Sequence, residues 1–260
     1  MAAPIRVAIL SFAHYHANFW AEAFRDSPLA EFVGMQSFPK RFDPVNHELR
    51  RMIRRGELGR ILLARIRHGH FHGLDPHFTS EWHMDPVLGG GGALLDEGIH
   101  GADLIRYLFG DPERVTAMTS DAALALRVED VAVALFRFRN GLLAELSASC
   151  AFVAGDNSVE VYGTEGAAVV SGVDLASRDV TPEAFLKIYR VGQSERRWDV
   201  SPIIPRFKTG GFHQQNPLHF LEAISQGAPS PVTLEDGQRA LAMILAAYRS
   251  ARTGQTQPIR

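Results

Sequence analysis

The pattern of apolar and polar positions predicts that the chain opens with a strand, a helix and a second strand. Residues 5–10 form a short apolar run, residues 15–25 carry apolar side chains at helical spacing, and residues 30–34 are largely apolar again. This spacing matches a β-α-β unit, which occupies about 30 residues. A further helix is predicted at residues 45–55. The start of the chain is therefore expected to be mixed α/β.

Residues 89–108 combine four glycines with an amphipathic helical pattern. Apolar residues between 93 and 108 recur at steps of three and four, which predicts a helix with Asp96, His100 and Asp103 on one face. A carboxylate one turn before an imidazole can fix the tautomer of the ring, and histidine titrates near neutral pH. Asp96 and His100 are therefore predicted to transfer protons, the alternative being a dipole-stabilising Asp96 and a hydrogen-bonded core His100. The glycine run predicts close approach of the backbone to a ligand.

The second half of the pattern predicts hairpins followed by two helices. Alternating segments flank an Asn-Gly turn at residues 140–141, and two further strand pairs follow. The predicted strands are residues 114–118, 131–138, 142–153, 159–162, 167–170, 185–191 and 197–200. The predicted helices end near Gly227 and Arg252, and Thr233 is the predicted N-cap of the second. One sheet face is expected to pack on helices and the other to serve as a dimer interface.

Composition and charge restrict the partners. With 46% apolar residues in 260 positions, the chain can bury a core and divide into two unequal domains. A formal net charge of −2 provides no basic stripe for nucleic acid or for a membrane surface, so a small-molecule substrate is expected. The chain shows no membrane-spanning apolar run and no signal-peptide pattern, so a cytoplasmic location is expected. The single Cys150 is expected to be a small buried hydrophobe.

Histidines cluster before the glycine run. His68, His70 and His72 alternate along a predicted strand at residues 61–72, so their side chains are expected on one face. Neutral imidazoles at this spacing can bind a divalent metal. The candidate ligands, which include two histidines near the N-terminus and one in the central helix, are His14, His16, His70, His72 and His100. The spacing is neither that of a zinc finger nor H-E-x-x-H, so it does not by itself identify a metal site.

The segment from Trp82 to Asp103 resembles a signature of the Gfo/Idh/MocA family. It matches the pattern W-x-x-D…G-G-G-x-x-x-D-x-G-x-H-x-x-D, with Asp96 and His100 at the central acid and histidine. The resemblance implies an NAD(P)-dependent oxidoreductase of sugars or polyols, with an N-terminal Rossmann domain and a C-terminal α/β domain built on an open sheet. It also implies that Asp96 and His100 line the substrate site and that His100 is the general acid/base.

The resemblance also implies substrate-binding residues and an oligomer. In the family the histidine-bearing strand borders the substrate site, where polar side chains can hydrogen-bond sugar hydroxyls. The residues assigned to substrate binding, drawn from this strand, the signature and the start of a later helix, are His70, His72, Trp82, Asp103 and His213. Family members associate through the open sheet face, so a homodimer or higher homo-oligomer is expected.

The predicted dinucleotide loop departs from the usual fingerprint. Where G-x-G-x-x-G would follow the first strand, the residues assigned to bind NAD or NADP are Ser11, Phe12, Ala13, His14 and His16. The ribose-binding acid after the second strand and the family's E-K-P lysine are also missing, while Lys40 is expected to be a solvated loop charge. Residues 1–43 are therefore assigned to a truncated Rossmann-like unit, and residues 44–260 to a substrate and dimerisation domain with a large, mainly antiparallel open sheet.

Three functions follow from these observations. The first is oxidation or reduction of a sugar, polyol or related hydroxy-compound with His100 as general acid/base. The second is a metal-dependent or cofactor-independent lyase, hydrolase or isomerase that has lost dinucleotide binding. The third is a non-catalytic ligand-binding protein. Retention of Asp96 and His100 favours a catalytic chain, whereas the missing glycines weigh against ordinary dinucleotide binding.

Overall fold

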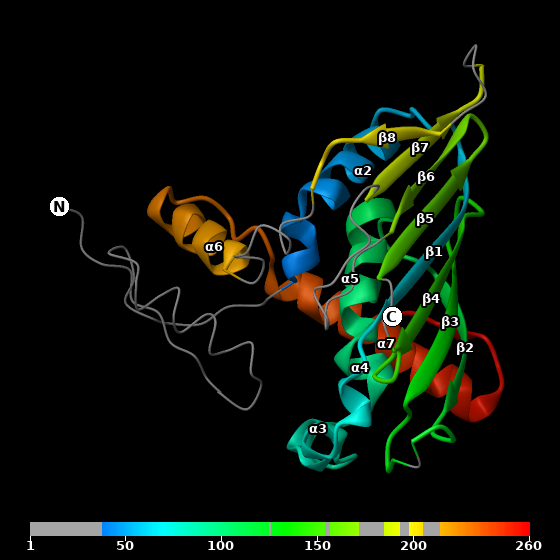
Figure 1. Ribbon diagram of the computed structural model, residues 1–260, viewed down its shortest axis with the longest axis vertical. Coiled ribbons are helices and arrows are strands. Elements are labelled where there is room, and N and C mark those ends of the chain that lie inside the picture. Colours follow the sequence, from blue (N-terminus) through cyan, green and yellow to red (C-terminus); the bar gives the residue numbers. More distant parts are fainter. Residues whose placement is uncertain (1–37, 125, 154–156, 172–184, 193–197, 205–213) are drawn as a thin grey trace.

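The computed structural model describes residues 38–260, apart from residues 125, 154–156, 172–184, 193–197 and 205–213 (Figure 1). The predicted β-α-β unit lies outside the described residues, and with it lie Ser11, Phe12, Ala13, His14 and His16. His213 lies outside them as well. The described part therefore corresponds to the predicted substrate domain and the segment that leads into it.

A nine-stranded sheet forms the centre of the described part, in the order β8-β7-β6-β5-β1-β4-β3-β2-β9 (Figure 1). Its strands are β1 (Ile61–Gly69), β2 (Arg114–Ser120), β3 (Val131–Arg137), β4 (Leu143–Ser149), β5 (Ser158–Gly163), β6 (Gly166–Val170), β7 (Leu186–Arg190), β8 (Asp199–Ser201) and β9 (Gln257–Pro258). Within the described residues, β1 and β4 form the one parallel pair, and the other neighbours are antiparallel. The prediction of a large, mainly antiparallel open sheet is confirmed.

The predicted hairpins form, but β1 is shorter than predicted. The β3–β4 turn contains Gly141 at φ +88°, a left-handed conformation that favours glycine. β1 ends at Gly69, whereas the pattern extends to His72. The Asn157 side chain accepts from the Gly69 amide at 2.8 Å and donates to the Gly69 carbonyl at 3.1 Å. These bonds satisfy the backbone groups with which Gly69 would otherwise continue the ladder, and the chain turns into the 3-10 helix η2 (His72–Leu74).

Helices cover one face of the sheet (Figure 1). The helices on that face are α2 (Pro44–Arg54), α5 (Gly98–Phe109) and α7 (Leu234–Thr253). The other helical elements are η1 (Pro39–Phe42), α3 (Pro76–Ser80), η3 (Trp82–Met84), α4 (Ala93–Asp96) and α6 (Gln215–Ser225), of which α6 lies apart from the sheet. The core between helices and sheet includes Ile105, Phe136 and Leu146, all fully buried. As predicted, Thr233 caps the last helix, in a reciprocal capping box with Asp236. None of the described helices has the length and apolar character that crossing a membrane would require.

The predicted central helix is divided into α4 and α5. The first part ends at Asp96, Glu97 forms the junction, and α5 begins at Gly98. At this junction the His100 amide donates to the Glu97 carbonyl at 3.2 Å, a bond that spans three residues instead of four. Asp96 and His100 therefore lie on different helices, and the prediction of one continuous helical face is wrong.

Candidate functional site

The end of β1 and the junction between α4 and α5 bring two histidines against two carboxylates. The His68 Nδ1 atom lies 2.7 Å from Glu97 Oε2. The His70 Nε2 atom lies 3.5 Å from Glu97 Oε1 and 3.6 Å from Asp96 Oδ2. We call these four residues, His68, His70, Asp96 and Glu97, the histidine–carboxylate cluster. Alternation along the strand places His68 and His70 on one side, as the sequence predicts.

Close packing of α5 on the sheet holds this cluster together. A Cβ atom at Gly101 would lie 2.4 Å from Leu146 Cδ1, so a larger residue would require the Leu146 side chain or the helix to shift. On the strand side, the His70 amide donates to the Ser149 carbonyl at 3.1 Å. The helix junction is thereby fixed directly over the end of β1.

Glu97 is the central member of the cluster, and its role was not predicted from the sequence. Its side chain is only 9% exposed and contacts both histidines. Burial would raise the pKa of Glu97, but His68 and then His70 outweigh it and lower the pKa to about 2, so the carboxylate is ionised. The sequence signal that could have indicated this role is the position of Glu97 directly after the signature residue Asp96, near a predicted strand that carries histidines.

His70 has a hydrogen-bond pattern that defines its neutral tautomer. The His72 amide donates to His70 Nδ1 at 3.2 Å, so the ring proton of neutral His70 lies on Nε2, toward Asp96 and Glu97. Burial opposes protonation of His70, but Asp96 and Glu97 prevail and raise its pKa. The two carboxylates thus act as acceptors for this ring.

The hydrogen bond that His70 Nδ1 accepts also determines whether His70 can bind the predicted metal. His70, Asp96 and Glu97 offer ligand atoms that all lie within 4.8 Å of one another. A metal at His70 Nε2 would require that nitrogen to be free of its proton, whereas the His72 amide bond keeps the proton there. As placed, the three residues therefore form an ion-pair cluster and do not fit a metal centre. Of the other predicted ligands, His72 lies beside His70, with ring centroids 4.7 Å apart.

His100 lies next to the cluster on α5. Its ring centroid is 5.6 Å from that of His68 and 6.2 Å from that of Phe38, which meets it edge to face. Burial lowers the pKa of His100 to about 4, so the imidazole is neutral near pH 7. A neutral imidazole in this position can accept a proton.

Lys40 is buried near the same site, so the expectation of a solvated loop charge is wrong. It lies in η1, and the residue is 7% exposed. Burial lowers the pKa of Lys40, against the opposing effect of Asp43 and Glu97. The η1 segment folds back under α5, which the sequence pattern does not reveal.

Two residues assigned to substrate binding lie apart from the cluster contacts. Asp103 is fully buried and receives two hydrogen bonds from Arg41, at 2.8 Å and 2.5 Å. These bonds occupy both carboxylate oxygens with a structural ion pair. Trp82 begins η3 and is partly exposed.

The glycine run approaches protein groups. A Cβ atom at Gly92 would lie 2.1 Å from the Glu129 carbonyl oxygen, and one at Gly91 would lie 2.2 Å from the Tyr248 hydroxyl. The Glu129 carboxylate accepts from the amides of Gly92 and Leu94 at 3.0 Å and 2.9 Å, and from the Tyr248 hydroxyl at 2.6 Å. The sequence predicted close approach of the backbone to a ligand; at Gly91 and Gly92 the structure shows close approach to Tyr248 and Glu129.

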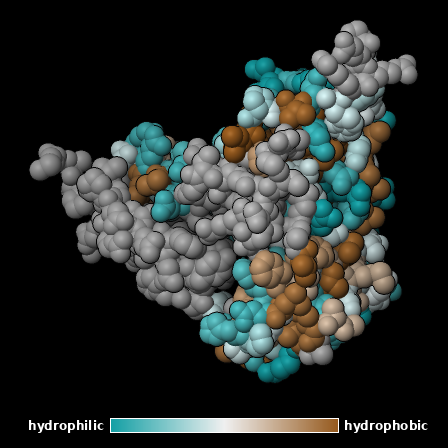
Figure 2. Space-filling model, in the orientation of Figure 1, coloured by the Kyte–Doolittle hydropathy of each residue, from teal (hydrophilic) through white to brown (hydrophobic). Residues whose placement is uncertain are grey.

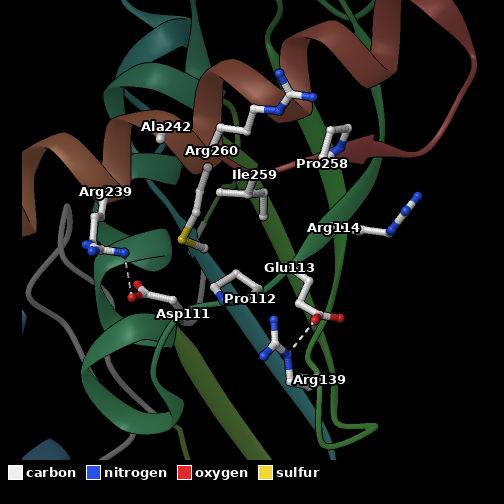
Figure 3. A pocket seen from close by; sticks show the side chains of 11 residues that line it. Asp111, Pro112, Glu113, Arg114, Arg139, Arg239, Ala242, Pro258, Ile259 and Arg260 are labelled. Atoms are coloured by element: carbon white, nitrogen blue, oxygen red, sulfur yellow. Dashed lines mark hydrogen bonds and ion pairs between the residues drawn. The ribbon is translucent and has the colours of Figure 1, made fainter.

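A cavity of ≈ 740 Å³ lies away from the cluster, between α7 and the β2–β9 edge (Figure 3). Two of its arginines are paired, Arg239 with Asp111 at 3.0 Å and Arg139 with Glu113 at 2.9 Å. In Figure 3 the Arg114 and Arg260 side chains point in different directions. The arginines do not converge on one point, so this cavity shows no constellation for catalysis.

Comparison with known proteins identifies the domain that carries the cluster. Residues 46–169 match the family model described as the GFO/IDH/MocA C-terminal domain. The 1,5-anhydro-D-fructose reductase of Ensifer adhaerens is 29% identical over 217 residues, which cover 83% of this chain and 61% of that protein. The myo-inositol 2-dehydrogenase of Thermotoga maritima is 27% identical over 239 residues, which cover 85% of this chain and 63% of that protein. The chain thus spans less than two thirds of either relative.

Solved structures share the fold. A levoglucosan dehydrogenase in complex with NADH and levoglucosan superposes with a TM-score of 0.75 at 24% identity, covering 96% of this chain and 79% of that one. At this identity the likeness establishes the architecture of the α/β chain.

Proposed function

This chain belongs to the Gfo/Idh/MocA family, and we propose that it oxidises or reduces a sugar, polyol or related hydroxy-compound with His100 as general acid/base. The observation that carries the proposal is the half-buried, neutral imidazole of His100 beside the histidine–carboxylate cluster. The signature acid Asp96 belongs to that cluster through its contact with His70. The relatives named as reductases and dehydrogenases of carbohydrates and inositols support this substrate class.

In this mechanism the described residues handle the proton. During oxidation, His100 accepts the proton of the substrate hydroxyl, and during reduction it returns that proton to the forming alkoxide. Asp96 holds a second hydroxyl or orients the substrate against His100. Neutral His70 carries its proton on Nε2. This N–H can also donate to a substrate oxygen when the substrate shares the contact that Nε2 makes with Asp96.

NAD or NADP would supply or accept the hydride. The residues assigned to it, Ser11 to Ala13 with His14 and His16, contain none of the three glycines of the usual cradle. They do not fit the ordinary phosphate-binding loop, and binding there would need a different arrangement. The proton-transfer residues, in contrast, all lie within the described domain.

Titration calorimetry of the full chain with NADH and NADPH tests the cofactor assignment first. Saturable binding, followed by nucleotide turnover with levoglucosan or myo-inositol, would support the oxidoreductase. His100→Asn should then lower kcat by about 100-fold or more, because general acid–base catalysis contributes that much. His77→Asn is the matched control, since His77 is 84% exposed on its side chain and should leave turnover unchanged.

Absence of nucleotide binding would overturn the oxidoreductase and favour the second candidate, a cofactor-independent lyase or isomerase. The specific observation in its favour is that His100, Asp96 and His70 themselves all belong to the described domain, outside the predicted nucleotide-binding unit of residues 1–43. Exchange of substrate C–H protons with deuterated solvent, dependent on His100 but not on nucleotide, would distinguish this activity. If the chain showed no nucleotide binding and no proton exchange, that result would indicate a ligand-binding protein.

A further inference from the structure

A second pocket lies between η1, α2, α5 and α6, and its volume is ≈ 440 Å³. Basic side chains line it from three of these elements: Arg41 from η1, His47 and Arg50 from α2, and His219 from α6. Glu222 is the one carboxylate among the described residues of the lining. Sites for small molecules measure roughly 300–1,000 Å³, so this pocket has the size of a ligand site.

Tyr107 on α5 brings three of these basic side chains together. The guanidinium carbon of Arg50 lies 3.9 Å from the centroid of the Tyr107 ring, and that of Arg41 lies 5.6 Å from it. The ring centroid of His47 is 6.3 Å from the same point. Because like charges around one ring repel each other, such an arrangement is stable only where anions compensate the cations.

The protein compensates Arg41 but not Arg50. Arg41 donates to the two oxygens of Asp103 at 2.8 Å and 2.5 Å, and its Nη2 atom lies 2.9 Å from Asp236 Oδ1. Arg50 is half-buried, and in the part of the chain that the structure describes no carboxylate forms an ion pair with it. Its Nε atom is buried and has no hydrogen-bond acceptor among the described residues. One guanidinium of the pocket therefore lacks its counter-ion.

The carboxylate of Glu222 does not take that place. Its Oε2 atom lies 3.5 Å from His219 Nδ1, and its Oε1 atom accepts from Gln226 Nε2 at 3.2 Å. These contacts hold Glu222 along α6, with 60% of its side chain exposed to solvent. The charge of Arg50 is thus available to a ligand in the pocket that it lines.

We propose that this pocket binds a small molecule carrying a phosphate or carboxylate group, with Arg50 as the principal contact of the anion. A planar guanidinium presents its N–H donors in a fork that matches two oxygens of either group. Stacking on Tyr107 orients this fork before the ligand arrives, so little side-chain entropy is lost on binding. Pro229 and Pro231 provide an apolar wall for the rest of the ligand.

This site goes beyond the proposed function and is separate from the histidine–carboxylate cluster. None of the described residues that line the pocket belongs to that cluster. Tyr107 follows His100 by seven residues on α5, which is roughly 10 Å along the helix axis at about 1.5 Å per residue. The anion is therefore a second ligand and not the substrate of His100.

Titration calorimetry of the full chain with inorganic phosphate and, separately, with sodium acetate tests the site at constant ionic strength. At least one anion should bind saturably, and the tighter one identifies the group. Arg50→Gln should weaken that binding by about tenfold or more, because hydrogen bonds between charged groups are the strong ones. Arg54→Gln is the matched control, since Arg54 is exposed on the same helix, lies outside the pocket lining and carries the same charge.

Absence of saturable binding by the wild type would overturn the site. Equal weakening in both variants would show non-specific attraction and would overturn the contact with Arg50. If Arg50→Gln does not fold, nitrogen-15 NMR of the wild-type histidine rings decides: the bound anion should shift His47 and His219, and leave the exposed His77 unchanged. A shift at His100 without one at His47 and His219 would place the anion elsewhere and overturn the proposal. Neither experiment needs nucleotide or a hydroxy-substrate, so failure of the oxidoreductase leaves both results interpretable.

Discussion

Replacing Gly92 by alanine separates the two explanations of the glycine run. The added Cβ would lie 2.1 Å from the Glu129 carbonyl oxygen and 2.9 Å from the Glu129 amide nitrogen. Both are backbone atoms, so neither can swing aside, and the start of α4 must move by roughly 1 Å to reach ordinary contact distance. That movement weakens the bonds from Ala93 to the Glu129 carbonyl, at 2.9 Å, and from Leu94 to its carboxylate, at 2.9 Å.

The expected loss is large for a single methyl group. Overpacking costs about 1–3 kcal/mol, and two weakened hydrogen bonds add about 1 kcal/mol each, so Gly92→Ala should lower the free energy of unfolding by about 3–5 kcal/mol. Gly90→Ala is the control from the same loop. Gly90 has φ +82°, but its added Cβ would meet only Leu95 Cδ2, at 3.6 Å. Its cost should be about 1 kcal/mol, from backbone strain alone.

Urea unfolding followed by tryptophan fluorescence measures both free energies. A loss at Gly92 within about 1 kcal/mol of the loss at Gly90 would refute the packing explanation, given the 10–15% error of extrapolation. If Gly92→Ala instead abolished ligand binding while stability stayed near the wild-type value, the glycine would serve a ligand. The comparison therefore tests what the close approach is for.

Three further predictions follow from the same structure. Tyr248→Phe removes the hydroxyl that donates to Glu129 at 2.6 Å. In the same urea assay it should lower the free energy of unfolding by about 1.5–3 kcal/mol, and a loss below about 0.5 kcal/mol would contradict a stabilising role of this bond. Because burial lowers the pKa of His100 to about 4, unfolding takes up a proton below pH ~6.5, so stability should fall between about pH 6.5 and 4. His100→Gln should reduce that fall, and an unchanged acid profile would argue against a buried neutral ring. The outward face of β3 exposes Val133 at 45% and Leu135 at 42%. If this face joins two copies, Leu135→Asp should convert a dimer into a monomer in light scattering, whereas a wild-type monomer would refute the homodimer.

The prediction of a homodimer depends on an exposed apolar surface, part of which can be seen in Figure 2. Figure 2 shows apolar side chains gathered over the lower part of the sheet and its neighbouring helices. Outward positions on β3 alternate with fully buried ones such as Ala134 and Phe136. When helices cover one face of an antiparallel sheet, the apolar residues on the second face stay exposed to solvent unless another surface covers them. The homodimer is therefore a prediction, and its physical reason is the burial of these exposed apolar side chains.

Local patterns were sufficient for most elements of the described fold. Alternation and the Asn140-Gly141 turn predicted β3 and β4, because strand period and turn chemistry are properties of adjacent residues. The N-cap threonine Thr233 likewise predicted the start of α7, and the structure adds its reciprocal capping box with Asp236. The buried Cys150 was predicted as a small hydrophobe and is fully buried. The boundary at Gly69 was missed because Asn157, 88 residues later in the chain, ends the strand.

The sequence by itself determined the shared face of His68 and His70, since that face depends on strand alternation, and it singled out His100 and Asp96 as candidates through the family signature. Only the tertiary structure decided that Glu97 stands between those histidines and that Lys40 is buried. Such facts depend on how closely a helix approaches a sheet and which distant segment folds beneath it. Periodicity carries no information on either, because burial and pKa are set by neighbours in space.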